Sequence, residues 1–175
     1  MKILLFALAA LALLVALAWL IGALLPRKHT ATRVVVIRQP ASVLFDTARD
    51  FARHPEWRRD LRAIEILPPL PPGASVRYRE TSAHGTMTYA LRAAEAPHRL
   101  VTEIADDALP FGGRWTIEFT PTGEGSTRVR VTEQGFVRPA LFRFLARFVF
   151  GHTRTMESYL RQLAAKFSET PALEP

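Results

Sequence analysis

Three side chains in this sequence could carry out acid–base chemistry in apolar surroundings, namely His152, Glu80 and Glu133. His152 lies between Phe148 and Met156 in an apolar stripe. One interpretation is a core histidine that is hydrogen-bonded to a neighbour. The other is a polar anchor in a ligand cavity, or a general acid/base whose pKa has been moved by burial.

The two glutamates alternate in step with apolar residues, which places both on the dry face of a predicted sheet. An unpartnered buried carboxylate costs several kcal/mol, so the pattern favours positions in water at strand ends. Alternatively, they line a cavity together with His152 and the hydroxyls of Tyr78, Tyr89 and Tyr159. Convergent polar groups in an apolar pocket are typical of a small-molecule site. The walls of such a cavity, or plain core in its absence, would be Met87, Leu100, Trp115, Phe119, Phe148 and Met156.

A long helix near the end of the chain must position several of these side chains. From Pro139 to Phe167, apolar residues recur at helical spacing on one side and arginines on the other. A continuous helix of this length would exceed about 40 Å. Gly151 interrupts the run and could mark a bend. A long one-sided helix that follows strands predicts a sheet wrapped around it.

Alternating residues and turn signals predict the strands of this sheet. Thr32–Arg38 reads as a first strand, and Pro40 then begins a helix that runs to Phe51 before a break at His54-Pro55. Leu61–Leu67 is the second strand, which a proline-rich loop over residues 68–73 terminates. Short connections between the remaining strands indicate an antiparallel meander. Those strands are Val76–Ser82, Thr86–Ala94, Arg99–Ala105, Arg114–Thr120 and Thr127–Val137.

Residues 37–45, followed by Asp50-Phe51 and His54-Pro55-Glu56-Trp57, resemble the opening signature of the START-like (SRPBCC) superfamily. Within it they are most similar to the polyketide cyclase/dehydrase and lipid-transport group. The resemblance covers Thr32 to about Ser168. It implies an α+β helix-grip fold, in which a curved antiparallel sheet wraps around a long C-terminal helix and two short helices follow the first strand. Such a fold leaves a ligand cavity between sheet and helix, but family members differ in activity, from lipid carriers to aromatic cyclases.

The N-terminal residues 3–25 form an uncharged apolar run long enough to cross a bilayer. The run predicts a single-pass transmembrane anchor over residues 1–26. A cleaved signal peptide is the alternative, although the run continues beyond a usual cleavage site. Residues 27–31 are then a linker, 32–168 the ligand-binding domain and 169–175 a disordered tail. The basic residues after the run slightly favour a cytoplasmic domain.

The net charge of +7 makes anionic lipid or nucleic acid a candidate partner. Arg143, Arg147 and Arg154 could rest on anionic headgroups, or could simply form a solvated face. No nucleic-acid-binding motif accompanies the charge, so no nucleic-acid partner is expected. With no cysteine and no ligand spacing among the histidines, the sequence predicts no metal, and it contains no motif for a cofactor.

These observations predict a membrane-anchored protein that binds a hydrophobic small molecule such as a lipid, isoprenoid or polyketide-like compound. A non-enzymatic role is favoured. The first alternative is an aromatase/cyclase-type enzyme that uses His152, Glu80 or Glu133 as acid/base. The second is an adaptor whose filled core leaves no cavity.

Overall fold

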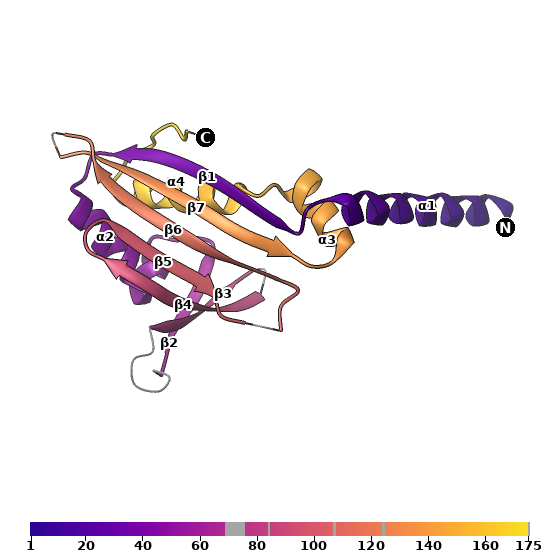
Figure 1. Cartoon of the computed structure of the whole chain (residues 1–175), viewed down its shortest axis with the longest axis horizontal. Coiled ribbons are helices and arrows are strands. Elements are labelled where there is room, and N and C mark those ends of the chain that lie inside the picture. Colours follow the sequence, from indigo (N-terminus) through magenta and orange to yellow (C-terminus); the bar gives the residue numbers. More distant parts are fainter. Residues whose placement is uncertain (69–75, 84, 107, 124, 175) are drawn as a thin grey trace.

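The computed structural model describes residues 1–68, 76–83, 85–106, 108–123 and 125–174. Most of the proline-rich loop and the His84 turn position lie outside the described residues. The elements, drawn in Figure 1, are α1 (Lys2–Leu24), β1 (Lys28–Ile37), α2 (Ala41–Arg49), the 3-10 helix η1 (Phe51–Glu56), β2 (Leu61–Leu67), β3 (Arg77–Ser82), β4 (Gly85–Glu95), β5 (Arg99–Ile104), β6 (Phe111–Pro121), β7 (Thr127–Val137), α3 (Ala140–Leu145), the π-helical turn η2 (Ala146–Phe150) and α4 (Arg154–Lys166).

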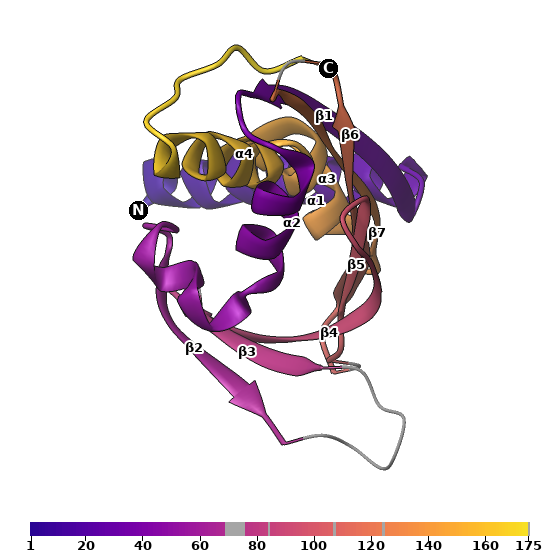
Figure 2. The same cartoon turned by 90° about the vertical axis from the view of Figure 1, so that its left-hand side faces the viewer.

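The strands form one antiparallel sheet in the order β1-β7-β6-β5-β4-β3-β2. The first strand therefore pairs with the last, and Figure 2 shows the sheet curving around α2 and α4. The predicted α+β helix-grip fold is confirmed. β2 and β7 have the predicted bounds, whereas β6 begins three residues earlier than the alternation indicated, at Phe111.

The core lies between the concave face of the sheet and the helices. Val129 and Val131 of β7 are fully buried, as are Leu160 and Leu163 of α4. From α2, Phe45 packs edge-on against Phe119 of β6 with ring centroids 5.9 Å apart. Each helix thus buries one apolar stripe against the sheet, which is why both follow helical periodicity in the sequence.

The continuous helix predicted from Pro139 to Phe167 is wrong. The chain leaves helical geometry at Gly151, whose φ of 74° is a conformation that glycine adopts readily. The final helix, α4, therefore has 13 residues and a length of about 20 Å. Apolar spacing continues through the break, so periodicity could not locate it.

Both ends of the predicted ligand-binding domain extend further than expected. Residues 28–31, predicted as linker, form the start of β1 and pair with β7. Residues 169–174, predicted as a disordered tail, fold back across β1. There Val34 and Glu174 exchange backbone hydrogen bonds of 3.0 and 2.8 Å, and Leu173 packs against the core.

The helix α1 extends away from the rest of the protein (Figure 1). Its length and apolar composition would allow it to cross a membrane, and a signal sequence would meet the same criteria.

Candidate functional site

A cavity of about 290 Å³ lies between the concave face of the sheet and the helices. Strands β3 to β7 supply one wall, and η1, α4 and the turn before α4 supply the other. Its volume is at the small end of the range for ligand pockets. Nine of the predicted site residues border it, namely Tyr78, Glu80, Met87, Tyr89, Leu100, Trp115, Glu133, His152 and Tyr159.

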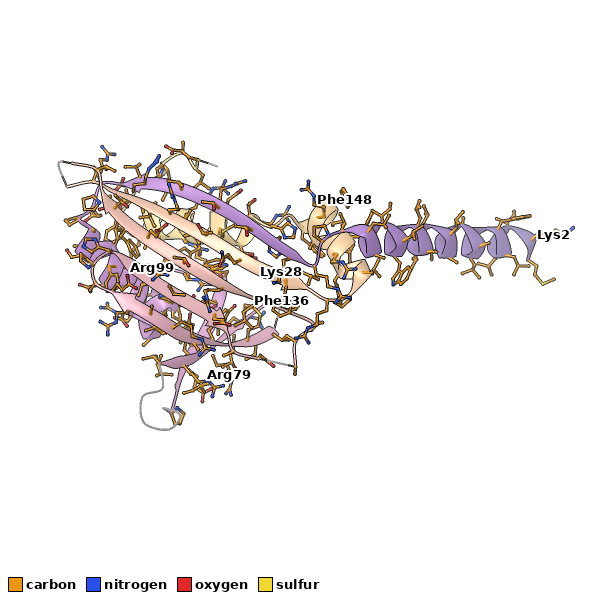
Figure 3. All side chains as sticks on the ribbon, in the orientation of Figure 1. Lys2, Lys28, Arg79, Arg99, Phe136 and Phe148 are labelled. Atoms are coloured by element: carbon orange, nitrogen blue, oxygen red, sulfur yellow. The ribbon has the colours of Figure 1, made fainter. Side chains whose placement is uncertain are left out.

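Three of the predicted wall residues lie elsewhere. Phe119 and Met156 belong to the closed core, where their exposed fractions are 1% and 0%. Phe148 is 59% exposed. It lies on η2 near the end of α1 (Figure 3). The break at Gly151 explains Phe148, because it separates the preceding turns from the stripe that α4 buries.

One side of the cavity contains a buried ion pair. Arg58, which follows η1, donates from Nη1 to Glu80 Oε1 of β3 and from Nη2 to Asp60 Oδ2, both at 2.7 Å. The side chains of Arg58 and Glu80 are each 10% exposed. Glu80 thus lies in the cavity wall with a partner, rather than in water at a strand end.

Burial shifts the ionisation of both members of this pair. Burial raises the pKa of Glu80 above its ordinary value, and the charge of Arg58 only partly opposes that rise. Burial alone would lower the pKa of Arg58, but the negative charges of Glu80 and Asp60 outweigh it and raise that pKa. Arg58 therefore remains a cation, and Glu80 and Asp60 both accept hydrogen bonds from its guanidinium group.

His54 and three tyrosines add neutral polar groups near Arg58. His54 donates from Nε2 to the Ala48 carbonyl oxygen at 3.0 Å, and burial lowers its pKa to about 4. Burial also raises the pKa of Tyr78, Tyr89 and Tyr159, so these phenols stay protonated. Phe51 and Tyr78 stack with ring centroids 4.1 Å apart, which makes the wall here aromatic.

Two buried polar atoms of this group lack a hydrogen-bond partner within the described parts of the chain. They are Arg58 Nε and His54 Nδ1. Because His54 donates through Nε2 and is neutral, its Nδ1 is an acceptor, whereas Arg58 Nε carries a proton to donate. Unsatisfied buried groups of this kind are rare in folded proteins and call for an explanation.

A second polar cluster lies on β7 and β1. Glu133 accepts from the indole Nε1–H of Trp115 at 2.7 Å and contacts His29 Nε2 at 2.9 Å. The His29 ring also stacks on that of His152, with centroids 3.9 Å apart. His29 and Glu133 are an imidazole–carboxylate pair in a cavity wall, an arrangement that can orient a proton-transfer group.

The position of His29 depends on the glycine opposite it in the sheet. His29 pairs with Gly135 of β7, and a Cβ on Gly135 would lie 2.4 Å from His29 Cε1. The imidazole therefore lies across the backbone of β7 and reaches both Glu133 and His152. Burial lowers the pKa of His152, and the nearby His29 lowers it further. Glu133 acts in the opposite direction but does not cancel these effects.

The sequence predictions missed Arg58, His54 and His29. His54 lies in the family signature and Arg58 follows it directly, at a helix break where no periodicity assigns a face. His29 was assigned to a linker because it follows the apolar run. The available signal was Gly135 within the predicted strand Thr127–Val137. A glycine there leaves room for a side chain from the neighbouring strand, and His29 is the residue that pairs with it.

One predicted lipid-contacting residue is buried. The side chain of Arg143 donates from Nε to the Gly22 carbonyl oxygen at 2.8 Å and also contacts the Arg138 carbonyl oxygen. Its exposed fraction is 8%, so it does not lie on a free surface. Arg147 and Arg154 are exposed. Across the described ranges, no group of three or more histidine, aspartate or glutamate side chains is arranged to hold a metal ion.

A sheet curved around helices with a cavity between them defines the START-like class of helix-grip proteins. The chain belongs to the family described as polyketide cyclase/dehydrase and lipid transport, which it matches over residues 28–168. No curated protein matches its sequence.

Solved structures share the fold at low sequence identity. A START superfamily protein from Mycobacterium smegmatis is 19% identical with a TM-score of 0.62, and the match covers 79% of this chain and 96% of that one. The Zhui aromatase/cyclase from Streptomyces sp. R1128 is 13% identical, with a TM-score of 0.64 and coverage of 79% and 93%. Norcoclaurine synthase from Thalictrum flavum is 13% identical, with a TM-score of 0.64 and coverage of 82% and 88%. At these identities the likeness concerns the fold alone.

Proposed function

We propose that this protein binds a hydrophobic small molecule that carries at least one polar oxygen, and that it does so at a membrane. The observation that carries the proposal is the cavity itself, whose wall is aromatic and aliphatic except for two polar clusters. Transfer of an apolar molecule from water into such a wall is favourable, and a few fixed polar groups then set its orientation.

The chemistry near Arg58 supports a neutral polar group on the ligand. Tyr78 and Tyr159 border the cavity, and their phenols can donate or accept a hydrogen bond. Arg58 Nε and His54 Nδ1, a buried donor and a buried acceptor of the same wall, have no partner in the described parts of the chain. Glu80 and Asp60 already balance the charge of Arg58. A carbonyl or hydroxyl oxygen therefore fits better than a carboxylate, which would meet two carboxylates already in place.

The helix α1 supports a membrane location, because it is long and apolar enough to cross a bilayer. Hydrophobic ligands of the proposed class also dissolve in bilayers. We propose that α1 is retained as a single-pass anchor. Of the cations predicted to touch anionic headgroups, Arg147 and Arg154 remain available to do so. A cytoplasmic position for the ligand-binding domain follows only from the basic residues after α1 and is part of the proposal.

Native mass spectrometry tests the binding. Full-length protein extracted in mild detergent from its own membranes should lose a discrete mass on denaturation. Thr102 of β5 lines the cavity, so Thr102→Trp should fill it and abolish the extra mass. Thr88 of β4 does not border the cavity, and Thr88→Trp should retain the mass. Ligand-free wild-type protein, even after incubation with its own lipid extract, would contradict the proposal.

The second candidate function is an enzyme, and the His29–Glu133 pair is the observation that favours it. The carboxylate orients the imidazole beside the cavity, as a general base requires. The likeness of the fold to an aromatase/cyclase suggests a polyketide-like substrate. His152, stacked on His29, would then assist in proton transfer.

Turnover distinguishes the two functions. A synthetic linear poly-β-ketone should remain unchanged, beyond its uncatalysed rate, if the protein is a carrier. If it is an enzyme, Glu133→Gln should abolish cyclisation, whereas Glu118→Gln in β6, outside the cavity wall, should not. A non-catalytic adaptor with a filled core is disfavoured, because the described residues enclose a cavity.

A further inference from the structure

The segment from Ala140 to Phe150, comprising α3 and η2, lies beside the last turns of α1 (Figure 1). Gly22 is the buried residue of α1, and a Cβ there would be 2.0 Å from the Ala140 carbonyl oxygen. The Arg143 Nε–H donates to the Gly22 carbonyl oxygen. The two helices touch at backbone distance. With α1 as the proposed anchor, this segment would lie at the level at which α1 leaves the membrane.

This segment presents four large apolar side chains to its surroundings. Phe142, Phe148, Val149 and Phe150 have exposed fractions of 52%, 59%, 54% and 55%, and we call them the apolar collar. Outside α1, the only other exposed phenylalanine of the described chain is Phe111, which borders the cavity. Exposed aromatic surface is thus gathered at one end of the protein, as at sites of protein or membrane interaction.

A basic groove lies between the collar and the end of α1. Arg27, Lys28 and Arg147 line it, and its volume is about 280 Å³. None of the three forms an ion pair with any residue that the structure describes. Unpaired cations beside an apolar surface are complementary to a bilayer with anionic headgroups.

The same segment also forms part of the cavity wall. Ala146 and Gly151 border the cavity, while His29 and His152 border both the cavity and the basic groove. The stacked imidazoles therefore separate the interior from the surface that carries the collar. The π-helical turn η2 and Gly151 interrupt the α-helix at this boundary. This part of the wall therefore lacks the continuous series of backbone hydrogen bonds that an α-helix would have.

We propose that the apolar collar and the basic groove dock onto a bilayer containing anionic lipid and hold the cavity entrance at the boundary of the acyl chains. This inference rests on the proposed membrane-anchored ligand binding. A hydrophobic molecule then passes between bilayer and cavity beside His29 and His152 without crossing bulk water. The collar, rather than α1 alone, sets the orientation of the protein on the membrane.

The chain contains no cysteine, so single cysteines can carry spin labels without background. Full-length Phe148→Cys and Phe150→Cys are placed in nanodiscs of phosphatidylcholine with or without phosphatidylglycerol. Electron paramagnetic resonance then compares collisions of the label with lipid-soluble oxygen and with a water-soluble nickel chelate. Leu13→Cys in α1 reports a deep position. Val43→Cys, an exposed apolar site on α2 away from α1, reports an aqueous one.

The oxygen-to-nickel collision ratio of the collar labels should exceed that of Val43→Cys several-fold, and should increase further with phosphatidylglycerol. Arg147→Glu should lower the ratio at Phe150→Cys in anionic nanodiscs, whereas Arg161→Glu on α4 should leave it unchanged. Collar labels as accessible to nickel as the Val43 label would overturn the docking. Equal ratios with and without anionic lipid would overturn the role of the basic groove.

Leu13→Cys separates this inference from the proposed function. If its label is deep while the collar labels are aqueous, the anchor is retained and only the collar docking fails. If Leu13→Cys is itself aqueous, α1 does not span the bilayer and the membrane part of the proposed function fails. Ligand binding is measured independently by native mass spectrometry, so its outcome does not depend on either result.

Discussion

Replacing Arg58 by methionine should destabilise the protein strongly, because it leaves Glu80 buried without a cation. The two side chains are each 10% exposed and are joined by a 2.7 Å contact. Methionine keeps much of the volume of the arginine stem, so the change mainly removes charge and hydrogen bonds. The other partner, Asp60, is 40% exposed and can be solvated after the substitution.

The expected loss follows from the burial of Glu80. Removing one member of a buried ion pair costs about 3–5 kcal/mol of unfolding free energy. A matched control lies on the same strand, where Arg79 contacts Glu65 at 2.6 Å but the side chains are 42% and 61% exposed. Arg79→Met should cost less than about 1 kcal/mol, since exposed pairs contribute little.

The loss in Arg58→Met should depend on pH in a defined direction. Burial already raises the pKa of Glu80, and removing the opposing charge of Arg58 raises it further. An acid whose folded pKa is raised favours folding while it is protonated, and that contribution is lost as pH rises through the folded pKa. The variant should therefore be closer to wild type at pH 5 than at pH 8.

Urea unfolding of the full-length protein in mild detergent, followed by circular dichroism, measures both effects. Arg58→Met/Glu80→Leu should recover most of the lost free energy, because an apolar pair can replace a buried ion pair. A loss below about 1 kcal/mol at both pH values would refute the buried pair, since that is the range of exposed pairs. An equal loss at pH 5 and pH 8 would refute the assignment of the loss to an ionised Glu80.

Three further predictions concern single residues. Gly135→Ala should displace His29, because the new Cβ would lie 2.4 Å from its ring, and an unchanged His29 chemical shift in NMR spectra would contradict this. The unfolding free energy of the wild type should fall by up to about 3 kcal/mol between pH 6.5 and pH 4. The reason is that His54, with a pKa of about 4 in the folded protein, is neutral when folded but binds a proton when unfolded. His54→Leu should flatten this dependence on pH, and an equal slope in the variant would exclude His54 as its source. Gly151→Ala should cost about 1 kcal/mol in urea unfolding, because φ is 74° although nothing crowds the new Cβ, and a stabilised variant would be inconsistent with that backbone.

Most of the sheet could be predicted from the sequence because turn residues separate the strands and strands such as β7 alternate between buried and exposed side chains. Val129 and Val131 point into the core while Arg128 and Arg130 point away, and the turn residues on either side fix the ends of β7. The C-terminal helix was harder to predict. Apolar residues keep helical spacing across Gly151, so the glycine suggests a bend, but the spacing does not reveal the π-helical turn and the positive φ that divide the run into two parts.

The candidate site could be predicted only in part, for a similar reason. Strand parity placed Tyr78, Glu80 and Glu133 on the concave face, where the structure has them. Parity gives the direction of a side chain but not its partner. Arg58 lies outside any regular element and approaches Glu80 across 22 positions of sequence, so only the three-dimensional fold reveals the pair.

The positions of the two polar clusters constrain what the cavity can hold. Glu80 is on β3 and Glu133 on β7, four strand spacings apart, or about 19 Å along the curved sheet. Tyr89 and Trp115, on the strands between them, make the intervening wall aromatic. The proposed ligand, with its oxygen at the Arg58 cluster, would therefore extend its apolar part along this aromatic wall toward His29. With the proposed entrance beside His29 and His152, that orientation would leave the polar end of the ligand inside and its apolar end at the entrance, which suits a molecule that enters from acyl chains with its oxygen first.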